Sequence, residues 1–557
     1  MLTFALLLTA AFCFRASVAR LLPHDEPGDG KSYTQIARNL LEQHVYSHAT
    51  EPPFDPSLIR LPGYPLFLAG IYAVFGHGDN TAVRIAQALI DTASCGLIAL
   101  LAFYWEPDEK LKRRSAIGAL ALAAASPFST IYVATILTET PTIFLAVAMC
   151  LTATLAFRAI DQRRAVLWWI ATGIISGLAV LFRPDSGLFA AAIGITLVAT
   201  LLRHSSDALE PQLSKDVRFR FSRAVLFGAI FSLAFCLVLV PWTIRNYRVF
   251  HLFQPLAPAH AEMPGEFVPR GYQMWLRTWI DDGRYIGPVL WGLDESPIRV
   301  VDIPERAFDS AEEKQRVAAL FDKYNHPPDE KSTESSDTQS EALPSDTDNQ
   351  AEADEQGNDN SSDNSNDNTN EDHSGSQNDE DADSGDEAEN DLEKQSSSDQ
   401  SSTQSVEMTP EIDAGFAQIA AERKKRHPLR YYLWLPFKRA LSMWFDTHSQ
   451  YYPFEGELLP LGDLDYEFQQ QFWLPLFAAL TFVYTLFGVA GGWFLWSSGL
   501  FTARRWLLLA ALMIFLRLGF FATLENPEPR YVVEVFPFLS VLGGIAITRL
   551  NSAQGTR

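Results

Sequence analysis

The sequence has 557 residues, a mass of 62.2 kDa, 47% hydrophobic residues and a formal net charge of −23. Residues 331–410 contain 14 Asp, 10 Glu and 2 Lys, a net of −22, so the other 477 residues carry only −1. The remainder consists of long apolar runs and short basic loops, which excludes a single soluble domain and a protein that binds nucleic acid through a basic surface. The composition predicts an all-α multi-pass membrane protein with an acidic insertion.

About ten apolar runs approach the 20 or so residues that a membrane-spanning helix needs. They are 1–22, 81–104, 116–137, 140–157, 166–182, 186–202, 224–243, 471–497, 506–523 and 531–549. Basic clusters follow the second, fourth, sixth and eighth runs, so all of them lie on one side if the N-terminus is cytoplasmic. The segments expected outside are then 23–80, 138–139, 183–185, 244–470 and 524–530.

The first apolar run has a second interpretation as a signal peptide. Ser17-Val18-Ala19 resembles a small-residue cleavage site. No basic segment precedes the run, however, and Arg15 interrupts it before that site. Both features favour a retained membrane helix.

The segment 329–410 is predicted to be a disordered insertion. It has no aromatic residue and almost no branched aliphatic residue, so it cannot bury enough apolar surface to offset its chain entropy. A calcium-binding loop is the alternative, because acidic residues alternate at Asp379, Asp381 and Asp383. The glycine comes one position late for an EF-hand, and position twelve is Asn390 rather than Glu. No other metal-ligand spacing is visible, and we expect no metal site.

These features divide the chain into five parts. Residues 1–243 form an N-terminal transmembrane part that includes the external loop 23–80. Residues 244–328 and 411–470 form a small external domain, which the insertion 329–410 interrupts. Its aromatic residues, including the run Tyr431-Tyr432-Leu433-Trp434, suggest that this domain lies against the membrane surface. Residues 471–557 return the chain to the membrane.

Three carboxylates lie directly after the first apolar run, at Asp25, Glu26 and Asp29, before an amphipathic helix that includes Tyr33. A partly desolvated carboxylate beside a membrane can act as general base for an acceptor hydroxyl. The alternative is a structural acid that satisfies the amides and the dipole at a helix N-terminus. Spacing alone does not decide between them.

Five further motifs lie in external loops or at external span ends. They are Arg60-Leu61-Pro62-Gly63-Tyr64, Leu137-Thr138-Glu139, Phe182-Arg183-Pro184, Pro241-Trp242-Thr243-Ile244-Arg245 and Glu528-Pro529-Arg530-Tyr531. Their order, spacing and common side resemble the GT-C membrane glycosyltransferases. The closest resemblance is to the dolichyl-phosphate-mannose protein mannosyltransferases and the bacterial aminoarabinose (lipid A) transferases. It covers residues 1–325 and 415–550.

The resemblance implies that an acid in the first external loop is the catalytic base. Asp29 stands four residues before Tyr33, as the family acid does, although Gly30 follows it where the family commonly has Glu. Asp25 with Glu26 is the alternative base. The family uses a sugar linked to a polyprenyl phosphate, so one base and cations for the departing phosphate suffice for single displacement with inversion.

Arginine suits the phosphate-binding role because its planar fork stays charged and binds phosphate oxygens bidentately. The residues that the resemblance offers are Arg60, Arg183, Arg245 and Arg530, with Tyr33, Tyr64, Glu139, Glu528 and Tyr531 in supporting positions. Each arginine can also be an ordinary interfacial residue that neutralises lipid headgroups. Glu139 is expected to hold one of the arginines in place.

The resemblance therefore implies an inverting glycosyltransferase, without cofactor or metal, and we expect it in a bacterial inner (plasma) membrane. Both termini are expected in the cytoplasm and the active site on the outside. Its expected partners are the polyprenyl-phosphate-sugar donor, a lipid, glycan or protein acceptor and membrane lipids, but no nucleic acid. A flippase of lipid-linked saccharides and a non-catalytic scaffold that recruits partners through the acidic segment remain as alternatives.

Overall fold

The computed structural model describes residues 2–22, 28–76, 78–202, 217–260, 262–281, 283–327, 406–446 and 468–554, which contain helices and no strand. Nine of the described helical segments are long and apolar enough to cross a membrane. They include α1 (Leu2–Leu21), α4 (Asn80–Trp105), α7 (Glu139–Arg158), α8 (Arg164–Phe182), α9 (Gly187–Leu202), α10 (Val217–Phe250), α16 (Phe468–Ser497), α17 (Phe501–Ala522) and α18 (Phe536–Gln554). The predicted all-α multi-pass membrane fold is confirmed.

The predicted span 116–137 is not one continuous helix. Helix α5 (Lys112–Ala125) ends before Pro127, and α6 (Pro127–Thr130) with η1 (Ile131–Val133) continues at an angle of 48°. Proline has no N–H to donate and disfavours helical geometry in the residue before it, and Ser126 accordingly has extended backbone angles. The two pieces make a tenth span when they are counted together.

Arg15 stabilises the break in this helix. Its guanidinium donates to the carbonyl oxygens of Ala123 at 3.1 Å and Ala124 at 3.2 Å, at the point where the helix is interrupted. Its Nε lies 2.5 Å from Asp91 Oδ2 on α4, and both side chains are buried. The arginine that interrupts the first apolar run thus joins α1, α4 and α5.

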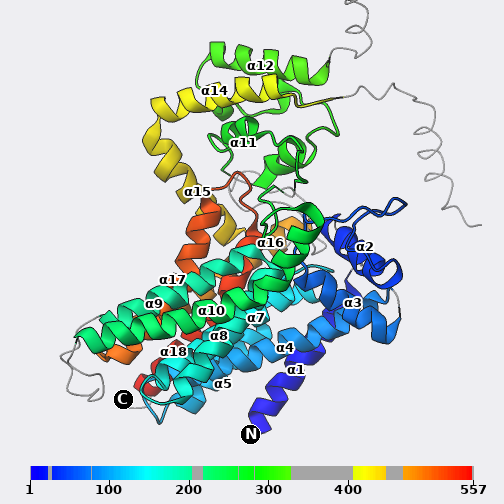
Figure 1. Ribbon diagram of the computed structural model, residues 1–557. Coiled ribbons are helices and arrows are strands. Elements are labelled where there is room, and N and C mark those ends of the chain that lie inside the picture. The colour runs from blue at the N-terminus through cyan, green and yellow to red at the C-terminus, as the bar shows by residue number, and fades with distance from the viewer. Residues whose placement is uncertain are drawn as a thin grey trace, which may run out of the picture.

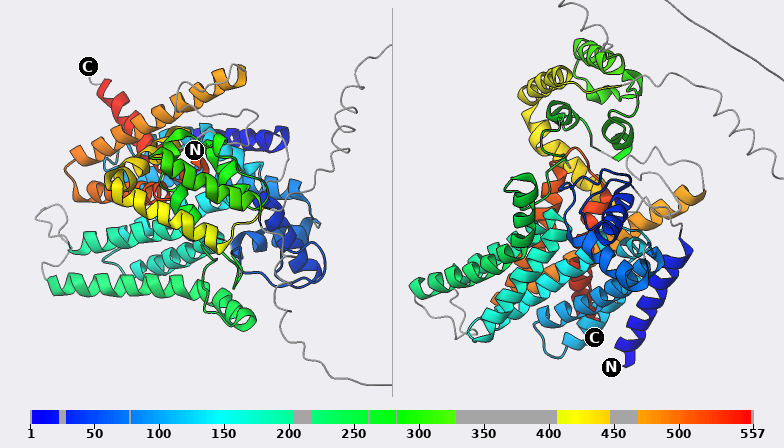
Figure 2. Two further views of the ribbon diagram at one scale, coloured as in Figure 1. Left: turned by 90° about the horizontal axis from the view of Figure 1, so that it is seen from above. Right: turned by 45° about the vertical axis from the view of Figure 1, so that its right-hand side comes forward.

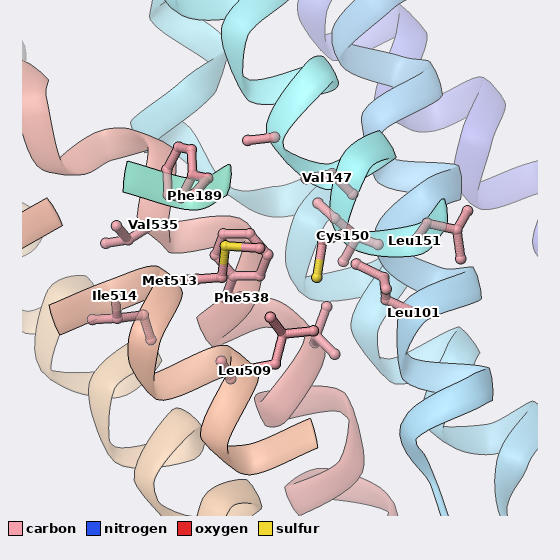
Figure 3. Close-up of a cluster of buried hydrophobic side chains, with 14 of the residues drawn as sticks. Leu101, Val147, Cys150, Leu151, Phe189, Leu509, Met513, Ile514, Val535 and Phe538 are labelled. Carbon is pink, nitrogen blue, oxygen red and sulfur yellow. The ribbon is translucent and has the colours of Figure 1, made fainter. Parts of the chain in front are cut away.

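The bundle packs around apolar side chains of helices that are distant in sequence. Leu101 of α4, Cys150 of α7, Phe189 of α9, Met513 of α17 and Phe538 of α18 meet in one cluster (Figure 3). Helix α1 begins and α18 ends at the same end of the bundle (Figure 1). We call this the termini end and the opposite one the site end.

A second core lies beyond the site end, in a unit that we call the cap domain (residues 270–327 and 406–426). Its helices are α11 (Arg270–Leu276), α12 (Ala311–Asn325) and α14 (Pro410–Arg426). They pack around Tyr272, Trp275, Phe321 and Phe416, whose rings contact one another. Figures 1 and 2 show these helices set apart from the bundle.

Segments on both sides of the predicted insertion connect to this core, and the insertion boundary at 410 is corrected to 405. Val406 and Met408 are buried in the cap domain, and the Met408 N–H donates to Asp294 Oδ1 at 2.8 Å. The Thr409 hydroxyl caps α14 by accepting from Ile412 N–H. The acidic residues 328–405 lie outside the described residues.

Helix α15 (Leu435–Phe445), preceded by the π-helical turn η8 (Arg430–Trp434), joins the cap domain to the bundle. The buried Arg439 guanidinium donates to the carbonyl oxygens of Ile280 at 2.7 Å and Arg277 at 2.6 Å in the cap domain. It also donates to Ala522 O at the end of α17, at 3.4 Å. Two shorter helices, α2 (Gly28–Glu42) and α3 (Gly63–Phe75), lie at the site end.

The basic loops predict that the cap domain lies outside the cytoplasm, and cysteine labelling tests this. In a cysteine-free background, Val301→Cys in the cap domain should react with an impermeant maleimide in spheroplasts, because Val301 is 81% exposed. Glu109→Cys, whose side chain is 82% exposed between α4 and α5, should react only after lysis. The reverse pattern would invert the topology.

Two deletions that differ by five residues test the corrected boundary. Replacing 331–405 with a short Gly/Ser linker should leave the thermal stability in detergent unchanged, because a segment of this polar composition has little apolar surface to bury. Replacing 331–410 also removes the buried Val406 and Met408, each of which contributes about 1.5–3 kcal/mol when fully buried. The longer deletion should therefore lower the unfolding temperature, and equal temperatures for the two variants would contradict the boundary at 405.

Candidate active site

Asp29 lies in the first turn of α2, where a carboxylate is favoured by the helix dipole. Its Oδ1 is 2.6 Å from Arg60 Nη2, and its Oδ2 is 3.4 Å from Arg530 Nη1. The side chain remains 30% exposed. The structure thus places one accessible carboxylate between two guanidiniums that come from the first loop and from the start of the last span.

Glu528 orients Arg530 from the other side. The Arg530 guanidinium forms a close ion pair with Glu528 through Nε. The same carboxylate accepts from Asn526 Nδ2 at 2.6 Å and from the Tyr531 hydroxyl at 3.0 Å. These bonds hold the segment between α17 and α18 in one conformation, with the far end of Arg530 directed at Asp29.

A network of buried ion pairs lies beside Arg530 and Glu528. Arg183 Nη1 is 2.8 Å from Glu139 Oε1, and Arg183 also contacts both oxygens of Asp185 at 3.2 Å. Arg517 Nη2 is 2.6 Å from Asp185 Oδ2 and 3.1 Å from Glu534 Oε1. The side chains are between 0 and 12% exposed. The network connects the site ends of α7, α8, α17 and α18 and the start of α9.

Two tyrosines, Tyr33 and the buried Tyr64, pack beside Arg60. The Arg60 guanidinium lies 5.7 Å from the centre of the Tyr33 ring, and Tyr33 contacts Tyr64 edge-on at 5.2 Å. The Tyr64 hydroxyl donates to Gln87 Oε1 at 2.9 Å. Burial raises the pKa of Tyr33 to about 12, so its hydroxyl stays neutral near neutral pH. Tyr33 can therefore support Arg60 and donate a hydrogen bond, but it does not supply a charge.

Arg245 is the one predicted phosphate ligand that the structure keeps apart from this cluster. Its guanidinium donates to Ser57 O at 2.7 Å and to Tyr46 O at 3.4 Å. It also lies over the Trp242 ring, 5.0 Å from its centre. These contacts hold the first external loop against the end of α10, and a role of Arg245 in binding phosphate stays a prediction.

The structure describes all of the remaining predicted site residues except two. Asp25 and Glu26 lie outside the described residues, so the alternative base remains a prediction. Within the described ranges, no group of three or more His, Cys, Asp or Glu side chains could hold a metal ion. The other predicted residues meet at the site end: Arg60, Arg183, Arg530, Tyr33, Tyr64, Glu139, Glu528 and Tyr531.

Sequence analysis missed four members of the site: Asp185, Asn526, Arg517 and Glu534. A signal for two of them was present. Arg517 and Glu534 are charged residues inside the predicted spans 506–523 and 531–549, and charges inside spans usually pair with one another. No spacing rule connected them to Arg183.

Part of the chain matches a known protein family. Residues 55–211 match the family model described as dolichyl-phosphate-mannose-protein mannosyltransferase. This stretch includes Arg60, Glu139 and Arg183 but neither Asp29 nor Arg530. No curated protein matches the chain.

Solved structures give distant matches. The archaeal oligosaccharyltransferase AglB from Archaeoglobus fulgidus, in complex with an inhibitory peptide and a dolichol-phosphate, is 12% identical with a TM-score of 0.45 over 99% of this chain. This chain spans about half, 50%, of its length. ArnT from Cupriavidus metallidurans bound to undecaprenyl phosphate is also 12% identical, with a TM-score of 0.32 over 99% of this chain and 79% of that one. TM-scores below 0.5 do not establish a common fold.

The buried network predicts a large effect of removing one cation. Arg517→Met would leave Asp185 and Glu534 with one shared arginine instead of two, and an uncompensated buried charge costs about 3–5 kcal/mol. The apparent unfolding temperature in detergent should fall clearly. Arg299→Met, which breaks an exposed pair with Asp302, is the matched control and should change it little. Equal effects of the two substitutions would mean that the network does not stabilise the fold.

Proposed function

We propose that this chain is a GT-C glycosyltransferase that moves a sugar from a polyprenyl-phosphate donor to an acceptor hydroxyl, with inversion, on the external face of a bacterial inner membrane. The observation that carries the proposal is the accessible Asp29 carboxylate between Arg60 and Arg530. The family match over 55–211 supports the same reaction class.

In this mechanism Asp29 is the general base. It accepts the proton of the acceptor hydroxyl as the acceptor oxygen bonds to the anomeric carbon and the bond from that carbon to the phosphate oxygen breaks. The electron pair leaves with the phosphate, which is a good leaving group, so a second carboxylate of the glycosidase type is not required.

Arg60 and Arg530 are the phosphate ligands in this proposal. Both are partly exposed, at 28% and 19%, and both contact Asp29. A donor phosphate at this position competes with Asp29 for the two guanidiniums. When the two guanidiniums bind phosphate, the Asp29 carboxylate is released from its ion pairs and can face the acceptor hydroxyl.

Arg183 has a different role, because its guanidinium is already shared among Glu139, Asp185 and Glu534 and its side chain is only 12% exposed. We assign it to positioning. Glu139 holds it in place at 2.8 Å, and its guanidinium lies 5.6 Å from the centre of the Tyr531 ring, next to Arg530 in sequence.

The catalytic assignment predicts that Asp29→Asn lowers transfer from a polyprenyl-phosphate-sugar donor by about 10²–10⁴-fold, the usual size of a general-base effect. Donor affinity should not fall, because the substitution releases Arg60 and Arg530 from their ion pairs. Arg530→Gln should weaken donor binding instead. Turnover and donor affinity are measured separately for each variant.

Asp55→Asn is the matched control, since Asp55 is an exposed carboxylate in the same loop. It should leave transfer unchanged. Full activity of Asp29→Asn together with loss of activity in Asp25→Asn would move the base to Asp25. Full activity of both variants would refute the mechanism, and the flippase and scaffold alternatives would then regain weight.

A further inference from the structure

The outward face of α15 and of the turn η8 before it exposes a continuous apolar stripe. Leucine or phenylalanine recurs at every fourth residue, and two amphipathic aromatic side chains flank the series. The exposed fractions are Leu429 73%, Leu433 65%, Phe437 53% and Leu441 36%, with Tyr432 at 64% and Trp434 at 53%. We call these six residues the α15 stripe.

The opposite face of the same helix is buried against the rest of the protein. Leu435, Arg439 and Met443 are at most 3% exposed. Arg439 bonds the carbonyl oxygens of the cap domain and of α17, and the Trp444 indole donates to Thr485 of α16 at 2.9 Å. These contacts fix the orientation of the helix. Because the opposite face is buried, the α15 stripe points away from the protein.

The segment that carries the α15 stripe is basic in sequence, and several of its cations also pair with carboxylates of the cap domain: Arg426 and Arg430 with Asp309, and Lys438 with Asp281 at 2.9 Å. Residues 423–445 contain seven arginines and lysines and no aspartate or glutamate, in a chain whose net charge is −23. Lys438, at 44% exposure, lies 5.9 Å from the centre of the Trp434 ring. Basic residues combined with Trp, Tyr, Leu and Phe on one face are typical of helices that lie in the headgroup region of an anionic membrane.

The α15 stripe is continuous with a surface that faces lipid. Phe445, four residues after Leu441, contacts Phe482 of α16 with ring centres 4.6 Å apart. Phe482 is 53% exposed on a helix that is apolar enough to span the membrane, and Leu486 and Val489 continue this surface at 65% and 66%. In Figure 1 the gold helix that carries the stripe runs across the direction of α9 and α10, as a helix parallel to the membrane plane would.

We propose that the α15 stripe docks on the anionic headgroup layer of the bilayer, on the side of the cap domain. The leucines and phenylalanine enter the acyl boundary, the two aromatic side chains lie at the headgroups, and the partly exposed cations of the segment, Arg426 at 40% and Lys438 at 44%, meet lipid phosphates. Because Arg439 connects the other face to Arg277, Ile280 and Ala522, docking fixes the cap domain relative to the site end of the bundle. This role does not depend on the proposed transferase reaction.

Spin labels on the full-length protein test the proposal. The protein is reconstituted in nanodiscs of phosphatidylcholine and phosphatidylglycerol, in a cysteine-free background, with nitroxides at Leu433→Cys and Phe437→Cys. Relaxation by oxygen, which concentrates in lipid, is compared with relaxation by a water-soluble nickel chelate. Leu233→Cys, 72% exposed on the span α10, is the lipid reference, and Val301→Cys, 81% exposed in the cap domain, is the water reference.

We expect the ratio of oxygen to nickel accessibility at positions 433 and 437 to lie several-fold above that at 301 and near that at 233. Ratios at 433 and 437 equal to that at 301 would overturn the proposal, because the stripe would then face water. Spin–spin broadening at 433 in singly labelled protein would also overturn it, since a second copy of the chain would cover the stripe. Both tests use exposed positions, so folding is preserved.

Discussion

The arrangement at the site end depends on the pairing of arginines with carboxylates near the ends of membrane spans. A charge at this depth is costly unless it is paired, so each arginine restricts where its partner helix can lie. Arg183 and Arg517 share Asp185 and Glu534, and these contacts bring together the ends of α8, α17 and α18 and the start of α9. Arg15 and Asp91 apply the same constraint between α1 and α4, around the broken helix α5. The apolar core supplies the bulk of the packing, but the charges determine which helix ends meet.

The exposed fraction of the arginine side chains increases from the buried network to the two arginines that contact Asp29. Arg517 is fully buried, Arg183 is 12% exposed, Arg530 19% and Arg60 28%. The inner arginines are shared among several carboxylates and cannot leave them without stranding a buried charge. The outer two can exchange Asp29 for another anion at lower cost, because water reaches them. A rigid inner network with exchangeable outer cations is the arrangement that preorganised phosphate binding requires.

Much of the fold could be predicted from the sequence because span length and basic loops are local properties of the chain. The common side of Asp29, Arg183 and Arg530 followed from the number of spans between them, and the structure brings these residues to one end. The kink at Pro127 was missed since the apolar run continues across it. The separate position of Arg245 could not be predicted, because its partners are backbone carbonyls of Tyr46 and Ser57, which leave no trace in side-chain identity. The spacing of residues along the chain indicates on which side of the membrane each one lies, but it does not indicate which side chains contact one another.

One short segment connects the cap domain to the site. Arg277 of the cap domain lies 2.5 Å from Glu525, and Glu528, three residues later, holds Arg530 against Asp29. Between them, Asn526 bonds both Glu528 and the Tyr531 hydroxyl. A shift of the cap domain would therefore move Glu525 through Arg277. The hydrogen bonds among Asn526, Glu528 and Tyr531 would pass this movement on to Arg530. Arg439 also connects the same domain to the last carbonyl of α17, so the segment is held at its start as well. The position of Arg530 therefore depends on a domain that does not itself contact Asp29.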